Sequence, residues 1–406
     1  MDSKTTEECD VLIVGGGPAG LSVAAALPDD VTSIVVHQDR EIGLPVRTSG
    51  GSFLADVQRL GIPPDLYQVI SRCEAYADDV HVTLPLKGHT LVILAVTRLY
   101  RWLAAQSDHK AREMWLGHKF VGASRLPDGR ILANIRDRDG AMRAVRARFV
   151  VDASGWHLAV LKALGLRAPP QRRGIGIEYE YPLGRNAPDR CFLFVGDSVP
   201  AGYGWGFPTP EGTFRLGVGV LSPDTDASPR ALIDALLAGG AAERFGIELS
   251  GPRHVNGGIL PSVPYDPKLV FGNVIRVGDS ANFATPTVGE GIRICIEFGR
   301  ELGQALGISV RTGRRWPLWR YEWRCRRRLQ RDYRLGFAMN RRIATYTPAQ
   351  WRASIERLGR TNPDAVAAVL RSEFPVGKIA RMAWNGLKRR ARARLPGMGN
   401  SQNRRR

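Results

Sequence analysis

The sequence predicts a mixed α/β (α+β) fold that carries an inserted antiparallel sheet and ends in a helical region. Three observations lead to this prediction. A strand, a glycine-rich turn and a helix succeed one another at residues 10–27, and the same succession returns at residues 273–302. Between them, residues 175–220 hold short β-rich runs separated by turn residues, which is typical of antiparallel strands. The first and last segments therefore form one discontinuous Rossmann-type domain, into which the sheet is inserted.

The first glycine-rich turn has the fingerprint of a dinucleotide-binding site. Residues 10–27 read "DVLIVGGGPAGLSVAAAL", where Gly15, Gly17 and Gly20 form G-x-G-x-x-G between an apolar strand and a helix. The first glycine allows the tight turn, the second lets a pyrophosphate approach the backbone, and the third lets the helix pack on the strand. The helix N-terminus adds N–H donors for the phosphates. We expect these glycines to bind a dinucleotide.

The second strand departs from the usual pattern at its end. The stretch "SIVVHQDREIG" (33–43) places His37 where Asp or Glu normally contacts the adenosine ribose. An imidazole can hydrogen-bond a hydroxyl, and Asp39 follows closely in the sequence. We therefore expect His37 at the ribose, and this half of the domain leaves NAD and FAD both open.

Residues 273–302 decide between the two cofactors. They read as a strand ending at Asp279, a loop, and a helix that opens with Gly289, Gly291 and Ile292. An aspartate at a strand end can bind a ribityl hydroxyl. A glycine-rich helix start can direct N–H groups at the pyrimidine edge of a flavin, where the reduced ring carries negative charge. The two glycine motifs in this order favour FAD.

Two further elements bear on cofactor binding. Residues 148–166, "RFVVDASGWHLAVLKALGL", read as an apolar strand, Asp152-x-x-Gly155 and a helix, the DG motif of flavoprotein hydroxylases and reductases. The stretch "VTRLYRWLA" (96–104) places Arg98 at the start of a helix. We expect Arg98 either to contact the cofactor phosphates or to be a solvated helix arginine.

Four stretches together resemble the geranylgeranyl reductase family of FAD-dependent oxidoreductases, within the p-hydroxybenzoate hydroxylase-like flavoprotein superfamily. They are "GGGPAG", "REIGLPVRTSGG", "YGWGFPTPEGTFRLGVG" and "GDSANFATPTVGEGI", and the resemblance spans roughly residues 10–310. The third stretch fits the family pattern Y-x-W-x-F-P, eight residues, G-x-G from Tyr203 to Gly219. Archaeal members tend to have cysteine after "PVR", whereas Thr48 stands here. Any role of that cysteine is therefore absent or is performed by a hydroxyl.

The resemblance implies a domain division and a set of site residues. The FAD-binding domain is expected at 8–170 and 255–310, the substrate sheet at 80–95 and 171–254, and a basic helical C-terminal region at 311–406. Arg47 joins the cofactor-binding residues, and Thr48 lies near the flavin. Tyr203, Trp205 and Phe207 line the cavity between the flavin and a prenyl chain. The alternative for each ring is packing in the core, where aromatic residues of strands usually lie.

The implied reaction sets a requirement on that cavity. Hydride from reduced FAD cannot simply add to an isolated trisubstituted alkene, so protonation must lead or accompany it. The transition state then has tertiary carbocation character, which aromatic faces stabilise by roughly 0.5–2 kcal/mol each. We expect Trp205 and Phe207 to be cavity walls and Tyr203 to be a wall or a proton relay. The sequence does not locate the proton donor, and either NADPH or ferredoxin can be the electron donor.

Two other classes of flavoprotein stay open. One is an FAD-dependent monooxygenase or halogenase acting on an aromatic substrate, although the halogenase lysine would have to be Lys87, which lacks the aromatic surroundings seen in halogenases. The other is a non-redox cyclase of the lycopene cyclase type. Oxygen consumption would favour the first class, and an isomerised product the second.

The charge is concentrated in the last quarter of the chain. Residues 311–406 hold 26 Lys/Arg against 5 Asp/Glu, while the other 310 residues hold 32 against 34. This predicts an anionic partner surface. Tryptophans and arginines interleave at residues 316–343, as in interfacial helices, so we expect an anionic membrane. No nucleic-acid motif accompanies the charge, which argues against nucleic acid. The alternative is that this helix packs on the body and the end of the chain is a solvated tail.

The remaining composition narrows the class of protein. No run of about 18 apolar residues is present, and "MDSKTTEECD" lacks the pattern of a signal peptide, so we expect a cytoplasmic, peripherally membrane-associated protein. The five cysteines are scattered without a C-x-x-C pair, which argues against a disulfide framework or a zinc site.

Overall fold

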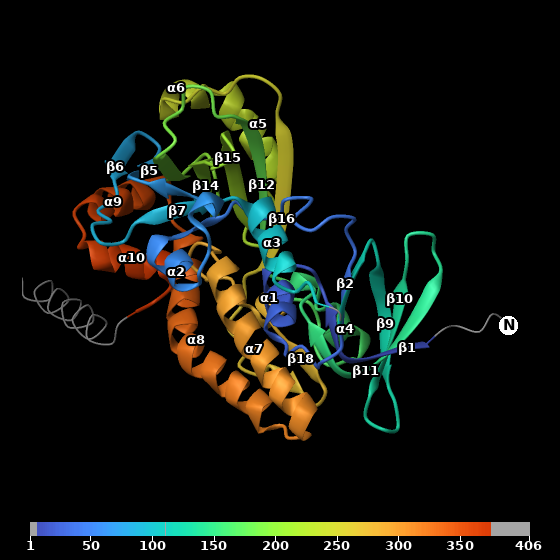
Figure 1. Cartoon of the computed structure of the whole chain (residues 1–406). Helices are drawn as coiled ribbons and strands as arrows, with labels where there is room; N and C mark the ends of the chain where they lie inside the picture. The colour runs from blue at the N-terminus through green and yellow to red at the C-terminus, as the bar shows by residue number, and fades with distance from the viewer. Residues whose placement is uncertain (1–5, 110, 375–406) are drawn as a thin grey trace, which may run out of the picture.

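A largely parallel sheet places the glycine-rich turn at its carboxyl edge. The computed structural model describes residues 6–109 and 111–374 (Figure 1). The strands of this sheet are β1 (Thr6–Val14), β2 (Ser33–His37), β8 (Arg112–Leu116), β9 (Lys119–Arg125), β10 (Ile131–Arg136), β11 (Met142–Asp152), β17 (Val270–Phe271) and β18 (Val274–Arg276). Their order is β17-β18-β11-β1-β2-β8, with β9 and β10 branching from β11. The pairs β18–β11, β11–β1, β1–β2 and β2–β8 are parallel, so their carboxyl ends meet at one edge.

Helices α1 (Pro18–Ala26) and α7 (Ile292–Thr312) pack against each other on one face of this sheet. Gly299, Gly303 and Gly307 recur every fourth residue of α7; the first two face α1 and the third faces Pro28, just after α1. A Cβ atom at Gly303 would lie 2.4 Å from the carbonyl oxygen of Val23, so only glycine permits this approach. The short helix α4 (Ala159–Ala163) packs with β9 and β10 on the opposite face.

A second, seven-stranded sheet lies above the first (Figure 1). Its order is β16 (His254–Pro261), β12 (Arg173–Pro182), β15 (Thr213–Ser222), β14 (Gly202–Pro208), β13 (Arg190–Val195), β5 (Arg72–Ala77) and β6 (Val80–Thr83). Every pairing in it is antiparallel except β13–β5. Helices α5 (Pro229–Ala238) and α6 (Ala241–Phe245) cover its outer face over an aromatic core that includes Phe192 and Phe194.

A small third sheet connects these two parts. It consists of β3 (Gly51–Phe53), β7 (Leu91–Leu94) and β4 (Tyr67–Ile70), with α2 (Leu54–Arg59) and α3 (Val96–Ala105) beside it. The expected sheet segment 80–95 is thus divided, because β6 joins the seven-stranded sheet and β7 joins this one. Single 3-10 turns lie at Pro64–Leu66, Gly155–His157 and Gly278–Ala281.

Three helices form the described part of the C-terminal region. They are α8 (Trp316–Ile343), α9 (Pro348–Gly359) and α10 (Pro363–Arg371). Helix α8 packs along α7, and α9 and α10 lie beside β5 and β6 (Figure 1). The last part of the expected basic region 311–406, from residue 375 onward, lies outside the described residues. Within residues 6–109 and 111–374, no helix is both long and apolar enough to cross a membrane.

Candidate active site

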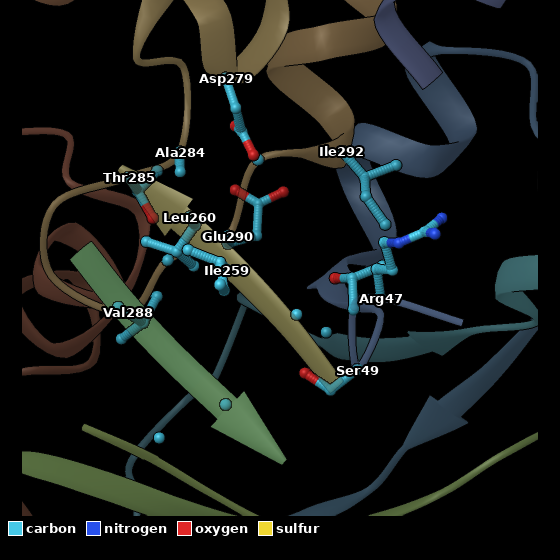
Figure 2. Close-up of a pocket in the computed structure, with 18 of the residues that line it drawn as sticks. Arg47, Ser49, Ile259, Leu260, Asp279, Ala284, Thr285, Val288, Glu290 and Ile292 are labelled. Carbon is cyan, nitrogen blue, oxygen red and sulfur yellow. The ribbon is translucent and has the colours of Figure 1, made fainter. Parts of the chain in front are cut away.

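One large cavity lies between the carboxyl edge of the first sheet and the inner face of the seven-stranded sheet. Its volume is about 1660 Å³, whereas a pocket for a single small ligand measures about 300–1,000 Å³. Figure 2 shows residues of the 47–49 loop, of β16 and of the approach to α7 around this space. The cavity therefore has room for more than one ligand.

The glycine-rich turn forms the floor at one end of the cavity. Glycine is present at each of its three motif positions for a different structural reason. Gly15 has φ +120°, and a Cβ atom there would lie 2.1 Å from the carbonyl oxygen of Ala153. A Cβ at Gly20 would lie 2.0 Å from the carbonyl oxygen of Gly15. Gly17, the N-cap residue just before α1, has no atom within 4 Å of such a Cβ and borders the cavity. The open space in front of Gly17 and the N-terminus of α1 fit a pyrophosphate.

His37 and Arg47 meet at Asp39 on the rim of this end. The N–H of Gly16 donates to Nδ1 of His37 at 3.2 Å, and Nε2 of His37 lies 3.3 Å from Asp39. Arg47 donates to both oxygens of Asp39, at 2.6 and 3.0 Å. Burial lowers the pKa of His37, so its ring is neutral near pH 7. His37, Asp39 and Arg47 all line the cavity, and a ribose contact of His37 stays a prediction.

The start of α7 forms the opposite wall of the cofactor end. Gly289 has φ +74°, and a Cβ atom there would lie 2.9 Å from the side chain of Leu260. Gly291, the N-cap residue of α7, has no side chain to cap the helix. The carboxyl group of Glu290 accepts from the backbone N–H of Arg293, and the N–H of Ile292 lies beside the space for an anionic ring edge. Ile292 and Asp279 line the same space (Figure 2). Burial raises the pKa of Asp279 to about 6.

Two motif residues lie away from the cavity. Arg98 is not among the lining residues, because its guanidinium binds the carbonyl and the carboxylate of Asp65. Asp152 is fully buried and accepts hydrogen bonds from the N–H groups of Val160 and Leu161, each at 3.0 Å. It therefore fixes the turn into α4 instead of facing a ligand.

The stretch "YGWGFP" forms β14, and its two faces have different partners. Cβ atoms at Gly204 and Gly206 would lie 1.9 and 2.2 Å from the rings of Phe194 and Phe192. These glycines therefore make room for the aromatic core under α5 and α6. The alternate residues Tyr203, Trp205 and Phe207 point to the inner face and line the cavity.

The indole ring of Trp205 packs against three glycines of the neighbouring strands. A Cβ atom at Gly217 would be 2.3 Å from its indole, and Cβ atoms at Gly176 and Gly219 would be 3.3 and 3.4 Å from it. The G-x-G part of the motif thus provides the space for the tryptophan of the same motif. Trp205 is only 8% exposed, and its Nε1–H donates to Glu178 at 3.0 Å. The indole of Trp205 is therefore packed in the sheet and also forms part of the cavity wall.

Tyr203, Phe207 and Thr48 complete the middle of the cavity. The hydroxyl of Tyr203 donates to the carbonyl of Val288, in the loop before α7, and burial raises its pKa to about 12. A phenol whose O–H is already bound to a carbonyl and whose pKa is raised is better suited to line the cavity than to relay a proton. Phe207 lies 3.5 Å from a Cβ position at Gly51. Thr48 is half-buried and also lines the cavity.

An acidic cluster on the inner face escaped the sequence analysis. Glu178 and Glu180 alternate with two tyrosines of β12, and both carboxylates point to the inner face with Arg215 and Asn256. The alternation in "GIEYEYPL" carried the signal, because Tyr179 belongs to the outer aromatic core and its neighbours must point the other way.

The far end of the cavity is an apolar arm. Leu193 and Val195 of β13 line one side, and Ile355, Leu358, Val366 and Leu370 of α9 and α10 line the other. The C-terminal region, expected to face a membrane, therefore also closes the cavity. We use the name apolar arm for the space between these six residues.

Residues 8–179 match the family model of the FAD binding domain. The match covers the glycine-rich turn, the rim at Asp39 and the DG motif. The chain is an FAD-dependent oxidoreductase with the α/β fold that the sequence predicted.

The predicted resemblance to the geranylgeranyl reductases is also confirmed. Digeranylgeranylglycerophospholipid reductase 3 of Methanosphaera stadtmanae is 23% identical over 321 residues, which cover 75% of this chain and 79% of the relative. The geranylgeranyl bacteriochlorophyll reductase-like protein of Thermoplasma acidophilum shares the fold with a TM-score of 0.79 at 19% identity, covering 91% of this chain and 96% of that chain. The flavin-dependent brominase Bmp2 does so with a TM-score of 0.68 at 16% identity, covering 94% and 100%.

Proposed function

We propose that this protein hydrogenates isolated double bonds of a prenyl, geranylgeranyl-type chain. The observation that carries the proposal is a single cavity that runs from the glycine-rich turn, past Tyr203, Trp205 and Phe207, into the apolar arm. The name of the Methanosphaera relative, a reductase of a geranylgeranyl lipid, supports the same substrate class.

The residues of the cofactor end fit FAD. Gly17 and the start of α1 would hold the pyrophosphate, Asp279 a ribityl hydroxyl, and the start of α7 the pyrimidine edge. When bound and reduced, FAD supplies a hydride. NADPH or ferredoxin would supply the electrons for its reduction.

The aromatic wall would act on the charge that develops in the alkene. Trp205 and Phe207 line the cavity, and a ring face of either one turned to the alkene would stabilise a tertiary carbocation by roughly 0.5–2 kcal/mol. The O–H of Tyr203 donates to the carbonyl of Val288, so its proton is not directed at the alkene. The apolar arm would hold the rest of the prenyl chain and exclude water.

A direct experiment tests this function. The protein is loaded with FAD, reduced anaerobically with dithionite, and mixed with a detergent-dispersed geranylgeranyl glycerophospholipid. We expect lipid masses that rise in steps of one hydrogen pair. Reoxidation of the flavin only when oxygen and an aromatic substrate are supplied would instead favour a monooxygenase or halogenase, whose fold is shared. An isomer of unchanged mass would favour a cyclase. Lys87, the lysine considered for a halogenase, is exposed and is not among the lining residues of the cavity.

Helix α8 supports peripheral membrane association as a further part of the proposal. Trp316, Trp319 and Trp323 are 45%, 60% and 54% exposed and recur at the spacing of one helix face. Arg320 and Arg327 are exposed on the same face, and the guanidinium of Arg327 lies over the ring of Trp323. Such a face would bury tryptophan in the headgroup region of an anionic bilayer.

Vesicle binding tests the role of this face. We expect the protein to bind phosphatidylglycerol vesicles at low salt and to bind less at high salt, because screening weakens the arginine contribution. The double variant Trp319→Ala/Trp323→Ala should bind severalfold less at either salt concentration. Equal binding of the variant and the wild type would remove the tryptophan face from the proposal.

A further inference from the structure

Glu178 is a buried carboxyl group in the wall of the cavity. Its side chain is 4% exposed, and it lies on β12 directly across from Gly217, whose other neighbour in the sheet is Trp205. Its partner on the other side is Asn256 of β16. The residue thus stands in the same row of the sheet as the tryptophan of the aromatic wall, and it borders the cavity.

The cluster around Glu178 holds one more negative charge than positive charge. Two carboxylates, Glu178 and Glu180, share the single guanidinium of Arg215, which is 3.6 Å from the first and 3.2 Å from the second. All three side chains are largely buried, and an uncompensated charge in such a place is costly. A proton on one of the two carboxyl groups removes the excess.

Of the two carboxyl groups, Glu178 is the one that more easily carries this proton. Burial raises its pKa. Burial also opposes the ionisation of Glu180, but the attraction of Arg215 and the hydrogen bond from Thr213 outweigh it and lower the pKa of Glu180. The shorter approach of Arg215 to Glu180 agrees with this division.

The contacts of the Glu178 carboxyl group also bear on where its proton would point. The described protein groups that contact the Glu178 carboxyl are all donors: the Nε1–H of Trp205 at 3.0 Å, the amide of Asn256 at 3.3 Å and the guanidinium of Arg215. None of them can accept a hydrogen bond at these atoms. These three contacts offer no acceptor to an O–H on Glu178, whereas the cavity that Glu178 lines has room for one.

We propose that Glu178 is the acid that protonates the alkene, an inference that rests on the proposed prenyl reduction. Glu178 gives its proton to one alkene carbon while the other carbon accepts the hydride that reduced FAD supplies. The π bond would break and two C–H bonds would form, one with the proton of Glu178 and one with the hydride, whose two electrons reduced FAD would supply. The resulting carboxylate is stabilised by Trp205, Asn256 and Arg215 until water returns a proton.

Other acidic groups of the cavity are placed less well for this step. The phenol of Tyr203 is bound to Val288. Glu290 is held by Arg293 at 2.8 Å, in an ion pair at the start of α7. Asp279 follows β18 at the cofactor end, on the first sheet and not on the aromatic wall.

The variant Glu178→Gln tests the proposal, because glutamine keeps the shape and can still accept from Trp205. In a single turnover of the reduced enzyme we expect at least a tenfold slower hydrogenation, with unchanged FAD content and substrate affinity. Infrared spectra of the resting holoenzyme should show the C=O stretch of a buried protonated carboxyl group in the wild type and lose it in Glu178→Gln. A variant that hydrogenates at the wild-type rate would overturn the proposal while leaving the proposed function intact.

A second variant keeps the proposal testable if Glu178→Gln does not fold. Glu180→Gln removes a neighbouring negative charge, so Glu178 ionises more easily and its pKa falls. Since the reaction needs the protonated form, the fall in rate at alkaline pH should move to lower pH. An unmoved profile would overturn the assignment. If the wild type hydrogenates no prenyl substrate, the proposed function fails, and the infrared band still reports whether Glu178 holds a proton.

Discussion

The two ends of the cavity are built in different ways. At the cofactor end, short turns present backbone groups and open space, as at Gly17 and at the start of α7. At the apolar arm, side chains from β13 meet side chains of α9 and α10, which lie more than 150 residues later in the chain. A site made from backbone requires glycine at fixed spacings, whereas a site made from apolar side chains accepts many residues of similar volume. The first kind of site therefore leaves a readable pattern, and the second does not.

The largest expected effect is loss of FAD binding at the cofactor end, without loss of fold stability. Gly17→Asp should abolish FAD binding, because its side chain would occupy the space in front of α1 with a negative charge. The protein itself has no atom within 4 Å of that Cβ position, so the apo protein should keep its melting temperature. Absorbance at the flavin bands and thermal unfolding without FAD measure the two properties.

Gly15→Ala is the matched contrast. Its Cβ atom would lie 2.1 Å from a carbonyl oxygen, in a backbone conformation at φ +120° that alanine rarely adopts. We expect loss of fold stability as well as loss of FAD. Normal FAD binding by Gly17→Asp would contradict the placement of the pyrophosphate.

The second prediction concerns the wall between the two ends. Trp205→Ala should leave FAD content nearly unchanged and lower prenyl reduction by at least about tenfold, which corresponds to ~1.4 kcal/mol of transition-state stabilisation. Flavin absorbance and initial rates check the two halves of this statement. Since Trp205 is only 8% exposed, loss of FAD or solubility would show that the ring serves packing alone.

Much of the fold could be predicted from the sequence for the same reason. The glycine motifs around Gly15 and Gly289 fix the turns that lead into α1 and α7, and the local sequence determines both. The alternation in "YGWGFP" predicted an aromatic face, and the structure adds that its glycines accommodate Phe192 and Phe194 from the neighbouring strand.

The rest depends on contacts between distant segments. Arg98 lies in the first turn of α3, whose residue Val96 lines the cavity, but Asp65 in an earlier turn binds its guanidinium, which no local pattern reveals. The acid Glu178 gains its surroundings from β14, β15 and β16, and the apolar arm depends on where α9 and α10 dock. Such assemblies follow from the tertiary fold and not from spacing.

The third prediction tests the arm itself. Ser354 of α9 lines the cavity next to Ile355 of the arm, whereas its other neighbour Ala353 is exposed and does not line it. Ser354→Trp should fill the arm and raise KM for a geranylgeranyl lipid severalfold, with less effect on a shorter prenyl chain and none on FAD content. Ala353→Trp adds the same side chain outside the cavity and should behave like the wild type. Equal kinetics for the two variants would show that the prenyl chain does not enter the arm.

The last prediction concerns the ion pairs that connect α10, beside the apolar arm, to α7 at the cofactor end. It has the smallest expected effect on turnover. Glu373, just after α10, binds Arg293 in the first turn of α7 at 2.9 Å and also binds Arg328 and Arg371. Burial opposes its ionisation, but the three guanidinium groups outweigh it and lower the pKa of Glu373 to about 2 from an ordinary 4.5. A carboxyl group with a depressed pKa in the folded state stabilises the fold above pH 4.5, and this stabilisation is lost as the pH falls toward 2.

Glu373→Gln should therefore lower the free energy of unfolding at pH 7 by at most about 3 kcal/mol, and the difference from the wild type should shrink below pH 4.5. Urea unfolding across this pH range measures it, with Glu356→Gln, an exposed change on α9, as the control. A difference that stays constant with pH would mean that the charge of Glu373 does not hold α10 to α7.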